Sequence, residues 1–313
     1  MEILPLTLED REAWANLLAI SFGHSLSEMG EMLDNLCTNY SLVAWGAWDG
    51  SKLAAQYSCL VSPLLVPDVE SPESVGMSIN MAVDPDYRGQ GLVKRVAAPV
   101  YEALISQGAI AGVGFSNAAG VRVDKQSKGY GYRVVGQMKP VLALLLRRPA
   151  ADPLQLSETW PTKTKAFSYS PNNDAIRFAA TSKSIEHRFG RHSFRAYHFG
   201  VWESAQQIEG IVVYRAFKWK WIKGVALLAA YSDDLEQLIA RWGRTIWDNG
   251  VRFVRLLTTP TSQLLTALRK IGFAISLPYS RTPYYLTVKS LTENTPAILF
   301  DFSRWDCTGG DIR

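Results

Sequence analysis

One segment of the sequence has the composition of an anion-binding loop. It lies between a predicted strand and a predicted helix and reads Val83-Asp84-Pro85-Asp86-Tyr87-Arg88-Gly89-Gln90-Gly91-Leu92-Val93. Glycines at this spacing let several backbone N–H groups point into one concavity, and the start of the helix adds the positive end of its dipole. The loop therefore suits a pyrophosphate. It is neither a Walker loop, because no Gly-Lys-Ser/Thr follows, nor a dinucleotide fingerprint, because Gly-x-Gly-x-x-Gly is absent.

The histidines and cysteines do not predict a metal site. His187, His192 and His198 are more widely spaced than zinc ligands, and the arginines among them would repel a cation. A structural role and a role in acceptor binding stay open for this cluster. The three cysteines are far apart, odd in number and without Cys-x-x-Cys spacing. This argues against a disulfide framework and against a thiolate zinc site.

The length and composition predict a globular protein of two domains. The chain has 313 residues, of which 47% are apolar and 20% are charged, and a domain has about 150 residues. The apolar runs are shorter than the roughly 18 to 20 residues of a membrane span. Glu2, Glu9 and Asp10 stand where a signal peptide would have basic and then apolar residues. We therefore expect a soluble, cytoplasmic protein that does not bind a membrane.

Charge is distributed unevenly between the two halves. The net charge of +4 is too small to indicate nucleic-acid binding, and we do not expect it. Residues 1–150 hold 12 Lys/Arg and 15 Asp/Glu (−3), whereas residues 151–313 hold 21 and 14 (+7) together with seven of the ten tryptophans. The second half fits an ordinary core with a solvated basic face, and it also fits a site for an anionic or sugar-like ligand.

The first half of the chain is predicted as an α/β domain with a mixed sheet. Helical spacing of apolar residues begins at Thr7 and recurs from Met29 to Leu36. A helix at 91–107 contains Pro99, which should kink it. Strands are expected at 41–48, 52–60, 76–83, 109–116 and about 132–146. Helices and a meander followed by strand, helix and strand predict the mixed sheet.

The second half partly repeats this order after a boundary at 147–173, which has four prolines. Strands are expected at 210–217, 224–231 and 251–258, and a helix at 261–271. Asp233 and Glu236 form a predicted capping box for a further helix that ends at 248–250. Segments 274–279 and 284–288 are expected to close the domain as a hairpin. We predict domains at 1–148 and 173–313, joined by a linker at 149–172.

The sequence resembles the GCN5-related N-acetyltransferase (GNAT) superfamily in the loop and its neighbours. The pattern Val-x-Pro-x-x-Arg-Gly-x-Gly-Leu is followed by Phe115-Ser116-Asn117 and by Gly129-Tyr130-Gly131-Tyr132, which resembles the Gly-Phe that starts the family's last strand. The resemblance covers roughly residues 1–146 and persists over 200–290 as element order alone. It implies an α/β fold of two GNAT-like domains in tandem, each a mixed, mostly antiparallel twisted sheet flanked by helices, with a degenerate second copy.

This resemblance implies acetyl-CoA as the acyl donor and no metal. In the family the loop binds the pyrophosphate, the end of the preceding strand pairs with the pantetheine arm, and an Asn after the next strand contacts the cofactor. Carried over residue by residue, the cofactor-binding residues are Met81, Ala82, Val83, Arg88, Gly89, Gln90, Gly91, Leu92, Val93 and Asn117. The family's acceptor cleft lies at its first two helices, which makes His24, Glu28 and Glu31 the candidate substrate-binding residues.

The catalytic positions depart from the family pattern. Val93 stands where the family has a small residue, and Lys125 or Ser127 stands where it usually has a Tyr. The strand before the loop has no carboxylate to act as a general base, and its polar members are Ser78 and Asn80. We expect the amine to lose its proton through a water chain past these two residues. The catalytic candidates are Asn117, Ser78, Asn80 and Tyr130.

These features predict an N-acetyltransferase that moves an acetyl group from acetyl-CoA to an amine of a small-molecule acceptor. Amino sugars and nucleotide sugars are among the candidate acceptors. The alternative enzyme is an aminoacyl-transferring (Fem-like) ligase, because such ligases are also tandem copies of this fold, but the intact pyrophosphate loop speaks against it. A non-catalytic CoA-binding or interaction module is the third hypothesis, favoured by the missing Tyr and carboxylate. We expect one acetyl-CoA per chain, in the first domain.

Overall fold

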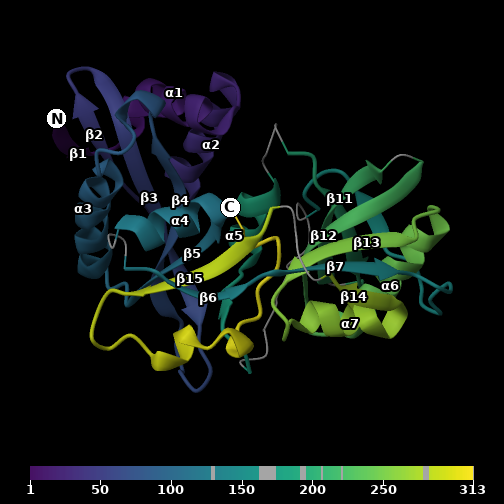
Figure 1. The fold of residues 1–313 in the computed structure, drawn as a ribbon. Coiled ribbons are helices and arrows are strands. Elements are labelled where there is room, and N and C mark those ends of the chain that lie inside the picture. Colours follow the sequence, from purple (N-terminus) through teal and green to yellow (C-terminus); the bar gives the residue numbers. More distant parts are fainter. Residues whose placement is uncertain are drawn as a thin grey trace. The chain divides into compact units, whose positions relative to one another are not determined.

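The computed structural model describes residues 1–127, 131–161, 174–190, 195–205, 207–219, 221–277 and 282–312 (Figure 1). The chain forms two compact units that are interleaved in the sequence. Unit 1 comprises Met1–Leu65, Val69–Gly136 and Tyr284–Asp301, and unit 2 comprises Val66–Asp68, Gln137–Pro283 and Phe302–Arg313. Each unit contains its own mixed sheet, flanked by helices. The expected α/β fold class with two helix-flanked mixed sheets is confirmed.

Unit 1 is built on a mostly antiparallel sheet with the strand order β1-β2-β3-β4-β5-β15-β6. Strands β4 and β5 run parallel, whereas β1 with β2, β2 with β3, β3 with β4 and β15 with β5 are antiparallel. The strands are β1 (Glu2–Pro5), β2 (Leu42–Asp49), β3 (Lys52–Leu65), β4 (Glu73–Val83), β5 (Ala111–Asn117), β6 (Arg133–Gln137) and β15 (Tyr284–Ser290).

Helices cover both faces of this sheet (Figure 1). On one face α1 (Arg11–Phe22) and α2 (Leu26–Asn39) bury Trp14 and Leu33 against Ala82 of β4. On the other face α3 (Leu92–Ser106) buries Val100 against Tyr57 of β3. α3 connects the parallel strands and continues through its internal proline as a single helix. α4 (Ala118–Ser127) follows β5 directly, and single turns form at Leu8–Asp10, Pro85–Tyr87 and Ala297–Phe300.

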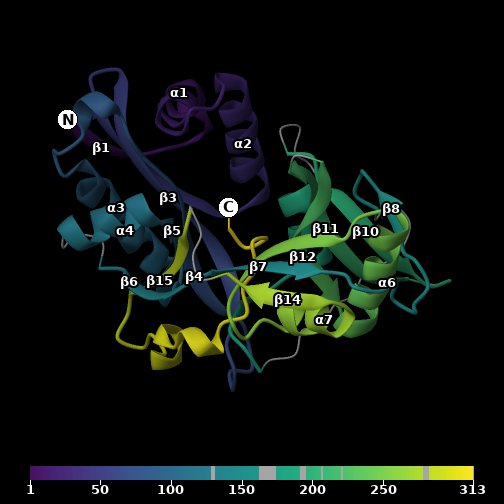
Figure 2. The same cartoon turned by 45° about the vertical axis from the view of Figure 1, so that its right-hand side comes forward.

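Unit 2 has the strand order β14-β7-β13-β12-β11-β10-β8, with β12 and β13 parallel (Figure 2). Its strands are β7 (Lys139–Leu144), β8 (Gln155–Ser157), β10 (His198–Glu203), β11 (Ile208–Trp219), β12 (Ile222–Ser232), β13 (Phe253–Thr258) and β14 (Phe273–Ser276). Its helices are α5 (Ser182–Ile185), α6 (Leu235–Asp248) and α7 (Gln263–Ile271), and short elements form at Arg177–Phe178, Glu186–Gly190 and Phe302–Arg304.

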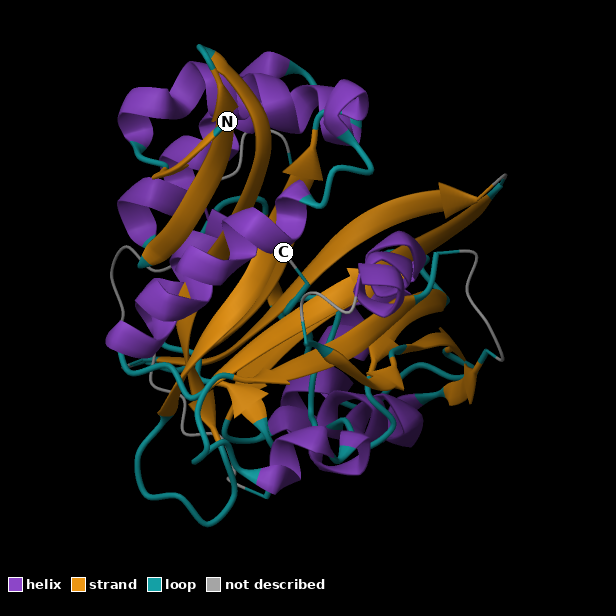
Figure 3. Ribbon diagram, turned by 60° about the vertical axis from the view of Figure 1, so that its left-hand side comes forward, coloured by secondary structure: helices purple, strands orange, loops and turns teal. Residues whose placement is uncertain are grey.

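The core of unit 2 lies on both faces of its sheet, which is visibly twisted (Figure 3). α6 and α7 pack on one face, where Leu238, Trp242 and Leu265 are buried. These positions repeat at helical spacing, which is why the segments fold as amphipathic helices. On the other face Phe199 and Ile211 belong to a second apolar cluster, which includes Ile185 of α5. None of the helices in the described part of the chain is long and apolar enough to span a membrane.

The predicted closing hairpin is wrong, because its two strands belong to different sheets. β14 pairs with β7 of unit 2, and β15 pairs with β5 of unit 1. The expected single strand at 132–146 is likewise two strands, since β6 lies in the first sheet and β7 in the second. The chain changes sheet between Gln137 and Lys139 and changes back before Tyr284. Apolar alternation predicts that a segment is a strand but does not select its partner.

Two predicted helix starts are also shifted. Thr7 caps only a single turn with its Oγ1, and α1 begins at Arg11. For α6 the N-cap is Asp234, whose Oδ1 accepts the Gln237 N–H at 2.9 Å, so the capping box expected at Asp233 and Glu236 is wrong by one residue. The first strand, β1, was not expected at all. At four residues it is too short to show an alternating pattern.

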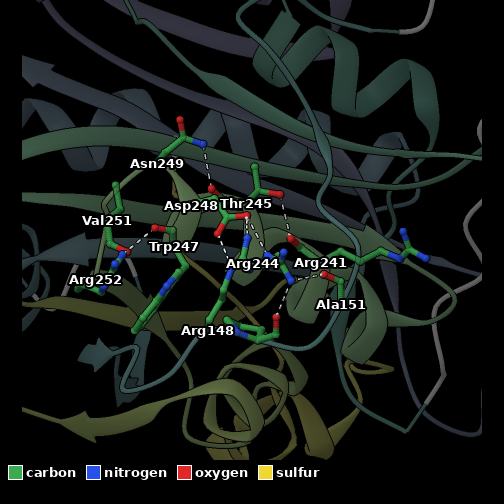
Figure 4. A network of polar contacts seen from close by, with 11 residues as sticks. Arg148, Ala151, Arg241, Arg244, Thr245, Trp247, Asp248, Asn249, Val251 and Arg252 are labelled. Atoms are coloured by element: carbon green, nitrogen blue, oxygen red, sulfur yellow. Dashed lines mark hydrogen bonds and ion pairs between the residues drawn. The ribbon is translucent and has the colours of Figure 1, made fainter.

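A polar network fastens the segment after β7 to α6 within unit 2 (Figure 4). Arg148 donates to both carboxylate oxygens of Asp248, with its Nε 2.7 Å and its Nη2 2.9 Å from them, and Arg244 donates to the same group at 2.8 Å. The Leu154 N–H donates to Thr245 Oγ1 at 2.7 Å. The hydrogen bonds from the two arginines lower the pKa of Asp248 to about 2. The first residues of the expected linker at 149–172 are therefore attached to a helix.

Candidate functional site

The predicted anion loop connects β4 to α3 in unit 1, and side-chain contacts fix its first residues. The Asp84 side chain is buried and lies 3.1 Å from the Lys52 Nζ. Burial raises the pKa of Asp84, but the hydrogen bond from the Asp86 N–H and the Lys52 ammonium outweigh this effect, and the pKa lies below its usual value. Tyr87 donates its hydroxyl proton to Asp49 at 2.8 Å. These contacts hold the start of the loop to β2 and β3.

Glycine is required at two positions of this loop. Gly89 and Gly91 have φ values of +79° and +70°, the left-handed region that side chains with a Cβ rarely adopt. Neither glycine has a neighbour within 4 Å of the place where a Cβ would lie, so the space above them is open. Gly91 is the N-cap of α3 and, having no side chain, offers no cap for the first N–H groups of the helix. The exposed loop thus presents helix-end N–H groups to an anion.

Arg88 precedes these glycines and is exposed. Its Nε donates to the Val83 carbonyl oxygen at 3.4 Å, a long hydrogen bond. The guanidinium therefore lies at the junction of β4 and the loop. A charged hydrogen bond from Arg to a phosphate is among the stronger contacts that a loop of this kind can add.

β4 and β5 separate next to the loop. Their parallel ladder runs from Val75↔Ala111 to Ser78↔Gly114, whereas β4 continues to Val83 and β5 to Asn117. We call this separation fork 1, formed by residues 79–83 of β4 and 115–117 of β5. At such a fork the two facing strands no longer pair with each other, and an added extended chain can pair there. Met81, Ala82 and Val83, the residues predicted to pair with a pantetheine arm, all lie in fork 1.

Asn80 sits at a bulge inside fork 1. Gln56 of β3 pairs with Ala82 and Ser58 pairs with Ile79, so two residues of β4 face one residue of β3. Asn80 has a φ of +46°, and its Nδ2 lies 3.7 Å from the Met32 Sδ of α2. The bulge therefore directs this polar side chain toward the face of the sheet that α2 covers.

Three hydroxyl groups meet where the ladder ends. Tyr57 donates to Ser78 Oγ at 2.9 Å, and the Tyr57 and Tyr132 hydroxyl oxygens are 3.2 Å apart. Burial raises the pKa of Tyr57 well above its usual value, so Tyr57 stays a protonated donor. A methyl group at Gly112 would collide with the Tyr132 hydroxyl. We did not predict this cluster; its signal in the sequence is a Tyr in a buried strand, since a buried Tyr hydroxyl usually needs a partner.

Asn117 ends β5 and caps the helix that follows. Its Oδ1 accepts the N–H groups of Ala119 at 3.0 Å and Gly120 at 2.9 Å. The oxygen is therefore occupied by α4, and the Nδ2 remains the group that could donate to a ligand. The side chains of Lys125 and Ser127 and the whole of Tyr130 lie outside the described residues.

His24 lies just before α2, and Glu28 and Glu31 lie in its first two turns; His24 and Glu31 are exposed, and Glu28 is half-buried. Glu28 Oε2 accepts the Ser25 N–H at 2.9 Å and completes a capping box, and the hydrogen bonds from Ser25 lower the pKa of Glu28. His24 Nδ1 is 3.8 Å from Glu28 Oε2. In the part of the chain that the structure covers, no hydrogen bond or ion pair joins these three residues to β4 or β5.

The described residues hold no group of three His, Cys, Asp or Glu side chains that could bind a metal ion. His192 lies outside them. His187 and His198 are on different elements of unit 2, the turn after α5 and strand β10. His198 stacks on Tyr214 with 5.4 Å between ring centroids.

The family comparison covers the part of the chain that contains the loop and fork 1. The sequence profile of the acetyltransferase (GNAT) domain matches residues 2–163, which is more than half of the chain. The chain belongs to the GNAT family. This GNAT chain is therefore an acyltransferase, with a fold built to bring an acyl donor and an acceptor together. Among curated proteins, no sequence matches it.

Solved structures share the fold at low sequence identity. A conserved Enterococcus faecalis protein described as a probable N-acyltransferase superposes with a TM-score of 0.68 at 11% identity, covering 94% of this chain and 73% of that one. A GCN5-related N-acetyltransferase from Anabaena variabilis gives 0.66 at 10% identity, covering 93% and 73%. Eis1 from Mycobacterium abscessus gives 0.60 at 12% identity, covering 93% and 74%. At these identities the likeness concerns the fold of the GNAT chain.

Proposed function

We propose that this GNAT protein transfers an acetyl group from acetyl-CoA to an amine of a small-molecule acceptor. The observation that carries the proposal is the position of fork 1 directly beside the glycine loop on one parallel strand pair. A long ligand with an amide-containing arm and a diphosphate fits this arrangement, with the arm in fork 1 and the diphosphate at the glycine loop. One acetyl-CoA binds per chain, in unit 1.

The residues of the loop and fork fit this donor. Gly89 and Gly91 leave open space above the uncapped start of α3, where a diphosphate would lie. Arg88 adds a cation, and Gln90, Leu92 and Val93 supply further backbone N–H groups. Met81, Ala82 and Val83 form the edge for the pantetheine arm, and Asn117 has its Nδ2 at the end of the opposite strand. When bound, acetyl-CoA supplies the activated acetyl thioester.

We assign proton transfer to polar side chains near Ser78, where the ladder between β4 and β5 ends. Because Ser78 Oγ accepts from Tyr57, its own proton is available to a neighbouring water or ligand. Tyr57, whose hydroxyl also contacts that of Tyr132, keeps the Ser78 hydroxyl oriented, and Asn80 adds an amide on the α2 face. With no carboxylate on β4 from Gly76 to Val83, water past Ser78 and Asn80 removes the amine's proton. A backbone N–H near Val83 polarises the acyl carbonyl.

The acceptor is the finer part of the proposal. His24, Glu28 and Glu31 are the proposed acceptor-binding residues, with Glu28 also committed to the cap of α2. The second half of the chain, proposed as a degenerate GNAT copy that binds no CoA, carries +7 and seven tryptophans. This composition favours an anionic or sugar-like acceptor, such as a nucleotide amino sugar. A cytoplasmic location is part of the same proposal.

Turnover of acetyl-CoA with a panel of amines tests the function. The panel contains amino sugars, nucleotide amino sugars and small uncharged amines, and the readout is the released CoA thiol. We expect release that requires an amine, and a KM for anionic acceptors that rises with salt because exposed charges are screened. No release with any amine by a protein that binds acetyl-CoA would contradict transfer. Equal salt dependence for charged and uncharged acceptors would contradict the anionic acceptor.

A further inference from the structure

Unit 2 contains a second strand separation of the same kind. β12 and β13 are parallel from Gly224↔Phe253 to Leu227↔Leu256, after which β12 continues to Ser232 and β13 to Thr258. We call this fork 2, formed by residues 228–232 of β12 and 257–258 of β13. As in unit 1, a helix, here α6, connects the two parallel strands (Figure 2).

The C-terminal segment of the chain, residues 305–311, lies in fork 2 and bonds to both strands. The Gly309 N–H donates to the Leu257 carbonyl of β13 at 2.7 Å, and the Gly310 N–H donates to the Leu228 carbonyl of β12 at 3.0 Å. Thr308 forms an antiparallel bridge with Thr258. The segment therefore spans the fork as an added extended chain, through main-chain hydrogen bonds.

Further bonds continue this pairing past the end of β13. The Cys307 carbonyl accepts Thr258 Oγ1 at 2.9 Å and the Thr259 N–H at 3.0 Å. The Cys307 N–H donates to Thr259 Oγ1 at 3.1 Å. Cys307, Thr258 and Thr259 are fully buried, so these bonds are shielded from water.

The two glycines in this segment differ in how closely they approach the sheet. A Cβ on Gly310 would lie 2.8 Å from the Leu228 carbonyl oxygen, which is backbone and cannot give way cheaply. A Cβ on Gly309 would have its nearest neighbour at 3.6 Å, an ordinary contact. Only glycine fits at 310 without moving the segment, whereas alanine fits at 309.

Both ends of the segment are fixed within unit 2. At one end Trp305 is fully buried, and Asp306 lies 3.6 Å from the buried guanidinium of Arg177. At the other end Arg188 donates to the Gly310 carbonyl at 3.2 Å and to the Ile312 carbonyl. The arginine-rich segment that the sequence analysis left open thus includes a residue that holds the C-terminal segment.

The space left beside the segment is small and its charge is unsuited to a diphosphate. A cavity of about 60 Å³ remains there, lined by residues that include two carboxylates, Asp306 and Asp311, and one cation, Arg177, which lies 3.6 Å from Asp306. Cofactor pockets are typically about 300 Å³ or more. At the start of α6 the Asp234 carboxylate accepts the first-turn N–H of Gln237, whereas α3 begins at an uncapped glycine.

We propose that fork 2 is a binding site for an extended amide chain and that residues 305–311 fill it from within the same molecule. The segment takes the place in unit 2 that a pantetheine arm takes in unit 1, and this excludes cofactor from unit 2. The assignment of the arm to fork 1 rests on the proposed function. The pairing of the segment with fork 2 does not.

The matched variants Gly310→Ala and Gly309→Ala test the proposal, with the buried Cys307 thiol as the reporter. Native protein is treated with iodoacetamide, and alkylation is followed residue by residue by mass spectrometry. We expect Cys307 to react at least tenfold faster in Gly310→Ala than in the wild type and in Gly309→Ala. Equal rates in all three proteins would overturn the pairing.

Pantetheine, which lacks the diphosphate, then probes the opened site. Protein saturated with acetyl-CoA is titrated with pantetheine in a calorimeter. We expect an additional site in Gly310→Ala that is absent from the wild type and from Gly309→Ala. A freed Cys307 without a new pantetheine site would overturn the assignment of fork 2. Absence of acetyl-CoA binding in the wild type would count against the proposed function alone, because the Cys307 rates are measured without ligand.

Hydrogen exchange on the wild type gives a test that needs no variant. The Gly309 and Gly310 amides should exchange as slowly as those of the β11–β12 ladder. Exchange at the rate of an unpaired chain end, with β12 and β13 still protected, would refute the proposal.

Discussion

Replacing Asn117 separates its two roles, helix cap and proposed cofactor contact. Asn117→Ala removes the acceptor of two N–H groups at the start of α4. Loss of an N-cap costs about 1 kcal/mol, which corresponds to a fall in Tm of roughly 2–4 °C for a unit of about 150 residues or more. Asn117→Asp keeps the acceptor oxygen and places a negative charge at a helix start, where it is favourable. Its Tm should therefore stay at or above the wild-type value.

The same two variants differ from the wild type in the amide donor. If Nδ2 donates to the pantetheine arm, both variants lose that hydrogen bond, worth about 1 kcal/mol or roughly fivefold in Kd. Differential scanning fluorimetry gives Tm, and calorimetry with acetyl-CoA gives Kd. An unchanged Tm in Asn117→Ala would refute the capping role. Wild-type affinity in Asn117→Asp would refute the cofactor contact, whatever the Tm.

Three further predictions concern stability and reactivity. The two arginines lower the pKa of Asp248 to about 2, so its stabilising contribution is complete above its usual pKa of 3.8 and is lost as pH falls toward 2. The urea midpoints of the wild type and Asp248→Asn should therefore differ more at pH 6 than at pH 3. An equal difference at both pH values would contradict this. Gly91→Ala should lower Tm, because a Cβ at φ +70° costs about 1–2 kcal/mol, and Gly91→Asn should lower it less, as thermal melts would show. Burial raises the pKa of Cys59 to about 12, and it also raises the pKa of Cys37, which is only half-buried. Iodoacetamide at pH 8 should therefore modify Cys37 first. Equal rates for the two thiols would contradict the burial of Cys59 in the core of unit 1.

The sequence predicted the segment from β4 to α3 well, because its determinants are local. A buried strand, two left-handed glycines separated by one residue and a helix with apolar residues at regular spacing all lie within about thirty residues. The helix begins at Leu92 after Gly91, one residue from the predicted start. The match to the family profile spans this region.

Features that depend on distant partners could not be predicted in this way. Nothing in the alternation of β7 or β15 states that β7 joins a different sheet from β6, or that β15 joins a different sheet from β14. The Tyr57–Ser78–Tyr132 cluster joins distant segments, and the two hints in the sequence, a Tyr in a buried strand and a glycine at 112 that leaves room for Tyr132, do not identify the partners. The segment 305–311 is short and mixed in composition, so its sequence does not predict that it pairs with the strands of fork 2.

The most direct test of the central claim is calorimetry of acetyl-CoA with the wild type, Arg88→Ala and Arg269→Ala. Arg269 is an exposed arginine on α7 of unit 2 and controls for the loss of one surface charge. The account predicts one site per chain in all three proteins, with affinity weakened about tenfold in Arg88→Ala, since a charged hydrogen bond is worth roughly 1.5 kcal/mol or more. Arg269→Ala should bind like the wild type. Two sites per chain, or wild-type affinity in Arg88→Ala, would contradict the assignment of the loop in unit 1 as the acetyl-CoA site.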